Sequence, residues 1–78
     1  MRLSLTAQTR SGQQVAVTTD SPLVAAAEVR DLALQTVTVG ADLSSIDEVS
    51  ALLYLLEAVR DGLNPERLNI HEQHRRRL

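Results

Sequence analysis

The chain contains no cysteine, lysine, phenylalanine or tryptophan, and Tyr54 is its only aromatic residue. Without cysteine there can be no disulfide, no thiol catalysis and no zinc or iron–sulfur site with cysteine ligands. A single aromatic residue cannot provide the stacking platforms on which single-stranded nucleic acids are bound. With only one aromatic side chain available, the hydrophobic core must be built from aliphatic residues.

The 78 residues are enough for one domain, which we expect to span residues 1–70, followed by a polar, basic tail at 71–78. A core of this size supplies only about 3–5 kcal/mol of net stability, so support from oligomerisation or a partner is expected. No apolar run approaches the roughly 18–20 residues of a membrane span, and the N-terminal residues alternate in polarity, unlike a signal peptide. We therefore expect a cytoplasmic protein without membrane contact.

Residues 2–7 and 14–18 alternate between apolar and polar side chains, which is typical of β-strands. Between them, Arg10, Ser11 and Gly12 predict a three-residue hairpin loop with Gly12 in the left-handed conformation. The partners expected across the hairpin are Ala7 and Val15, Leu5 and Val17, and Leu3 and Thr19. All core-facing residues then share one face of the sheet, and a slip by one residue would turn them to the other face.

A helix is expected next, from Pro22 to about Leu34, because Ser21 is a good N-cap and proline suits the first helical position. Its expected buried face is mostly small: Ala25, Ala26, Val29, Leu32 and Ala33. Small side chains allow a helix to approach the structure beneath it closely.

Val37 and Val39 predict a short strand that ends at Gly40, and a longer strand starting near Ala33 is an alternative because the alternation extends that far back. Residues 67–72 either form an edge strand or begin a further helical turn. The predicted fold is α+β with the order β-β-α-β-α and both helices on one face of a small sheet, and a short final strand is an alternative.

The strongest predicted helix begins at the N-cap Ser45, with Glu48 completing a capping box, and ends near Gly62. Its main apolar stripe, expected to face the core, contains Ile46, Val49, Leu52, Leu53, Leu56, Val59 and Leu63. A second apolar patch on the other side contains Ala51, Tyr54, Leu55 and Ala58. A helix with two apolar faces needs two surfaces to pack against. We therefore expect the second patch to bind another copy or a partner protein, the alternative being cover from the C-terminal segment.

Neither a catalytic site nor a metal or cofactor site is expected. His71 and His74 are three residues apart, whereas zinc-binding helices place their histidines at i and i+4. Asp42, Asp47 and Glu48 lack the spacing of a calcium loop, and helix capping explains the serines beside them.

The main functional expectation is a small, non-enzymatic interaction or regulatory module that self-associates and binds a protein through the second patch. One alternative is a nucleic-acid-associated regulator that contacts phosphate through Arg67, Arg75, Arg76 and Arg77. Against this, residues 1–70 carry five arginines and nine acidic residues, a net charge of −4. The other alternative is an acidic inhibitor that mimics nucleic acid with Asp42, Asp47, Glu48, Glu57 and Asp61.

Overall fold

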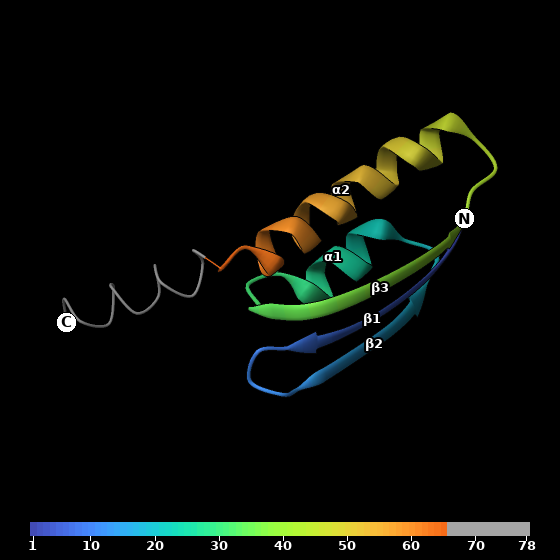
Figure 1. Ribbon diagram of the computed structural model, residues 1–78. Coiled ribbons are helices and arrows are strands. Elements are labelled where there is room, and N and C mark those ends of the chain that lie inside the picture. The colour runs from blue at the N-terminus through green and yellow to red at the C-terminus, as the bar shows by residue number, and fades with distance from the viewer. Residues whose placement is uncertain (66–78) are drawn as a thin grey trace.

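The computed structural model describes residues 1–65 and confirms the predicted order β-β-α-β-α (Figure 1). The elements are β1 (Arg2–Thr9), β2 (Gln14–Thr19), α1 (Pro22–Val29), β3 (Leu34–Asp42) and α2 (Ile46–Leu63). The predicted tail and the alternative final strand lie outside the described residues.

The three strands form one antiparallel sheet in the order β2-β1-β3. The hairpin register is confirmed, with Leu5 opposite Val17 at its centre. Thr9 donates its backbone N–H to the Gln13 carbonyl at 2.8 Å, and Gly12 has the left-handed φ of 94°. The loop chemistry therefore set the register as the sequence predicted.

Helix α1 is shorter than predicted, because it ends at Val29 instead of near Leu34. Asp31 takes a φ of 66° just after it, which turns the chain back toward the sheet. β3 then begins at Leu34, so the longer of the two alternative strands is present. The alternation of the residues from 34 onward favoured pairing with β1 over a further turn of helix.

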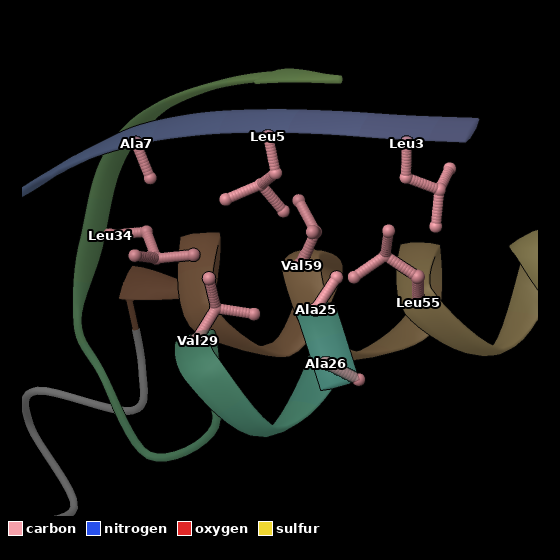
Figure 2. Packing of buried hydrophobic residues seen from close by; sticks show 9 residues of the cluster. All are labelled: Leu3, Leu5, Ala7, Ala25, Ala26, Val29, Leu34, Leu55 and Val59. Carbon is pink, nitrogen blue, oxygen red and sulfur yellow. The ribbon is translucent and has the colours of Figure 1, made fainter. Parts of the chain in front are cut away.

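Both helices cover one face of the sheet (Figure 1). Helix α1 packs on β2 and β1, and α2 packs on β3. The buried core between sheet and helices is entirely aliphatic, as expected (Figure 2). Its members are Leu3, Leu5, Ala7, Ala25, Ala26, Val29, Leu34, Leu55 and Val59. The opposite face of the sheet carries mainly exposed serine, threonine and glutamine side chains.

Helix α2 begins as predicted, with the Ser45 hydroxyl accepting the Glu48 N–H. It ends at Leu63, close to the predicted end near Gly62. Gly62 is buried and lies against the Leu34 side chain, so its role is close packing and not helix termination.

Candidate interaction surface

The face of α2 that packs against the core is not the face that was predicted to do so. Leu55 is fully buried and Val59 is 7% exposed, while Ala58 packs against the core from its edge. Leu55 belongs to the core, so the prediction that it lies in a free second patch is wrong. Ala51 and Ala58 are half-buried, and only Tyr54 of that patch is exposed.

Most of the predicted core stripe lies instead on the solvent side. Ile46 is 81% exposed and Leu53 is 55% exposed, and three more large apolar side chains accompany them. We call these five exposed residues the outer stripe: Ile46, Val49, Leu53, Leu56 and Leu63. Of the remaining predicted core residues, Val59 is buried and Leu52 is half-buried.

Small residues explain why α2 has this orientation. Ala51, Ala58 and Gly62 lie near Leu55 on the helix surface, at angular offsets of roughly 20–60°. With so little side chain between them, α2 and α1 pack closely, and α2 also packs on Leu34. Large leucines on this side would hold the two helices apart.

The outer stripe has the spacing of a helix–helix contact. Steps of three and four residues alternate along Ile46, Val49, Leu53 and Leu56, and continue through Arg60 to Leu63. This is the heptad spacing of the a and d positions in a coiled coil. In residues 1–65 no other element covers this side of α2, so the stripe forms a solvent-exposed seam.

Tyr54 is bound within its own chain. Its hydroxyl accepts a hydrogen bond from the Arg30 guanidinium at 3.2 Å, which connects α2 to the end of α1. Below this bond is a groove of about 310 Å³ whose other lining residues include Glu57 and Asp61. Tyr54 therefore belongs to the α1 side of α2, away from the outer stripe.

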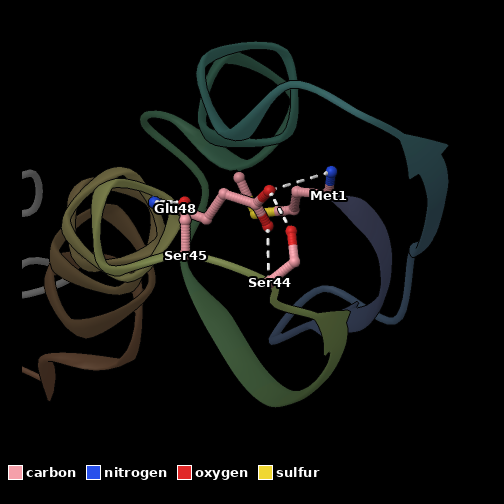
Figure 3. Close-up of polar contacts among 4 residues, drawn as sticks. All are labelled: Met1, Ser44, Ser45 and Glu48. Atoms are coloured by element: carbon pink, nitrogen blue, oxygen red, sulfur yellow. Dashed lines mark hydrogen bonds and ion pairs between the residues drawn. The ribbon is translucent and has the colours of Figure 1, made fainter.

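A polar cluster fixes the start of α2 (Figure 3). The Glu48 carboxylate accepts the Ser44 hydroxyl at 2.9 Å and the Ser44 N–H at 3.2 Å, and the Met1 ammonium lies 3.5 Å away. The hydrogen bonds from Ser44, followed by the Met1 charge, hold the pKa of Glu48 below its usual value. Glu48 thus reaches Ser44, one residue before the N-cap that a standard capping box uses.

The remaining predicted site residues fall into two groups. Arg67, Arg75, Arg76 and Arg77, like His71 and His74, lie outside the described residues. Asp42, Asp47, Glu57 and Asp61 are exposed, whereas Glu48 is half-buried in its cluster. Across residues 1–65, the acidic side chains form no group of three suited to a metal ion. In the same part of the chain, neither helix is both long and apolar enough to cross a bilayer.

Comparisons of the chain with protein families, with curated proteins and with solved structures found no match.

Proposed function

We propose that this chain is a small, non-enzymatic interaction module that self-associates through the outer stripe of α2. The observation that supports the proposal is the exposure of five large apolar side chains at coiled-coil spacing on one helix. Exposed apolar residues that occur singly are ordinary, but several large apolar side chains gathered along one side of a helix mark an interface.

The small core gives a second reason for association. Only nine apolar residues form the buried cluster of residues 1–65, and three of the nine are alanine. Domains of this size commonly gain stability by burying further apolar surface against a second chain. The outer stripe offers that surface without disturbing the core.

Leu56→Glu tests the proposal, because Leu56 lies in the outer stripe and is 39% exposed. A charge at the centre of an apolar contact should dissociate the assembly while the helical circular-dichroism spectrum persists. Leu23→Glu is the matched control, because Leu23 lies on α1 and is 62% exposed. Sedimentation velocity should show loss of assembly for Leu56→Glu alone.

An unfolded Leu56→Glu protein would contradict the assignment of Leu56 to the surface. Equal assembly of both variants would show that the outer stripe is not the contact. The nucleic-acid alternative predicts a different result, namely binding that weakens steeply with salt, whereas an apolar contact responds little.

A further inference from the structure

We infer that the second copy joins along the open edge of β3, so that two sheets of three strands become one sheet of six. This inference rests on the proposed self-association and adds its geometry. It commits to a two-fold pair in which β3 runs antiparallel to the partner's β3 and the two α2 helices lie side by side above them.

The outer edge of β3 can accept a strand. Within residues 1–65, β3 pairs only with β1, and it is the longest strand of the sheet. No charged residue and no proline occurs from Leu34 to Ala41, although such residues usually protect a free edge from pairing. The strand therefore carries nothing that opposes pairing.

The hydrogen-bond pattern shows which backbone groups face that edge. Thr9 donates its N–H toward β2, to Gln13, and the next residue, Arg10, donates to Ala33 on the β3 side. Successive residues of a strand direct their N–H and C=O groups to opposite sides. The even-numbered residues of β1 therefore bond to the even-numbered residues of β3. The N–H and C=O groups of Val37, Val39 and Ala41 therefore point to the open edge.

Three residues of the outer stripe project over the same edge. Tyr54 marks the flank of α2 that faces α1, through its bond to Arg30. Leu63, Leu56 and Val49 lie on the opposite flank, at about 80–120° from the inward direction of Leu55. Since α1 lies over β2 and α2 over β3, this flank faces outward past β3.

The other edge of the sheet lacks this combination. β2 is shorter than β3, and the helix above it, α1, carries the exposed acid Glu28 on its outward flank. Asp20 follows directly after β2. A second copy gains apolar contact beside β3 and would meet carboxylates beside β2.

The distribution of charge favours an antiparallel second copy over a parallel one. The end of α2 that carries Arg60 lies over the start of β3, as the contact between Gly62 and Leu34 shows. Antiparallel pairing therefore keeps the two Arg60 side chains at opposite ends of the contact. The two helix dipoles are also antiparallel in this arrangement.

Full overlap of two β3 strands places the two-fold axis at Thr38, the central residue of Leu34–Asp42. Thr38 is exposed on the polar face of the sheet, and its backbone groups bond to β1. The two Thr38 residues then form a non-hydrogen-bonded pair with a Cα–Cα distance of about 4.5 Å. A disulfide can span that distance.

Thr38→Cys tests the inference, because the chain has no other cysteine. Thr18→Cys is the matched control, being an exposed threonine on the same face of the opposite edge strand. Under mild oxidation, Thr38→Cys should form a covalent dimer at least roughly tenfold faster than Thr18→Cys, because the two introduced thiols are close together in the assembled pair. The amides of Val37, Val39 and Ala41 should also exchange more slowly as protein concentration rises.

A protein that is dimeric by mass, but whose two cysteine variants cross-link equally, would overturn the β3 pairing and leave the proposed self-association intact. A monomer at every concentration would instead contradict the self-association itself. Concentration-independent exchange at Val37, Val39 and Ala41 in a dimer would likewise overturn the strand pairing.

Discussion

Gly62 of α2 lies so close to Leu34 of β3 that a Cβ on Gly62 would come within 2.6 Å of Leu34 Cδ1. This contact fixes the height of α2 above the sheet and, with it, the face that α2 buries. Gly62→Ala should therefore destabilise the fold, although alanine is the better helix former by roughly 0.5–1 kcal/mol. We expect a net loss of about 1–2 kcal/mol in the free energy of unfolding, measured with urea at fixed protein concentration.

Gly40→Ala is the matched control for this prediction, because nothing lies within 4 Å of a Cβ at Gly40. It should change the free energy of unfolding by no more than about 0.5 kcal/mol. A Gly62→Ala protein as stable as wild type would mean that α2 does not rest on Leu34.

The burial of Leu55 predicts a large cost for its truncation. Leu55→Ala should lower the free energy of unfolding by about 2–5 kcal/mol, because it opens a cavity among fully buried residues. Leu23→Ala, at an exposed site on α1, should have an effect within about 0.5 kcal/mol. Comparable losses for the two variants would contradict the assignment of Leu55 to the core.

Glu48 should contribute stability that depends on pH. Because its pKa in the folded chain is lowered by Ser44, its contribution is present above the pKa of the unfolded chain and is lost as pH falls through the folded value. Glu48→Gln should therefore be less stable than wild type at neutral pH, and the difference should vanish in acid. Urea unfolding at several pH values checks this, with Glu57→Gln as the control. A difference that persists in acid would point to a packing effect.

The hairpin loop requires a left-handed residue at Gly12, whose φ is 94°. Gly12→Ala should cost about 1–2 kcal/mol of unfolding free energy, since side chains with a Cβ are strained in this conformation. The added Cβ meets nothing within 4 Å, so the whole effect is one of backbone conformation. Unchanged stability would show that the loop can adopt another turn.

The hairpin could be predicted residue by residue because its determinants are local. A glycine in a short loop fixes the turn, and the alternation of Leu3, Leu5 and Ala7 fixes which side faces inward. The start of α2 was predictable for the same reason, since Ser45 and Glu48 act within one turn.

The inward face of α2 could not be predicted from periodicity, because both sides of the helix are apolar. The side with more leucine was expected inside, but packing favoured the side with Ala51, Ala58 and Gly62. Those small residues beside Leu55 were the signal in the sequence, since they permit close contact with α1 and Leu34. The even alternation of three- and four-residue steps in the outer stripe was a second signal, typical of a helix seam.

The most direct test of self-association is the mass of the full chain by light scattering, at low and high salt and over a range of concentrations. We predict a dimer or larger assembly whose mass is nearly the same at both salt concentrations, because the contact is apolar. A monomer at every concentration would contradict the proposed self-association.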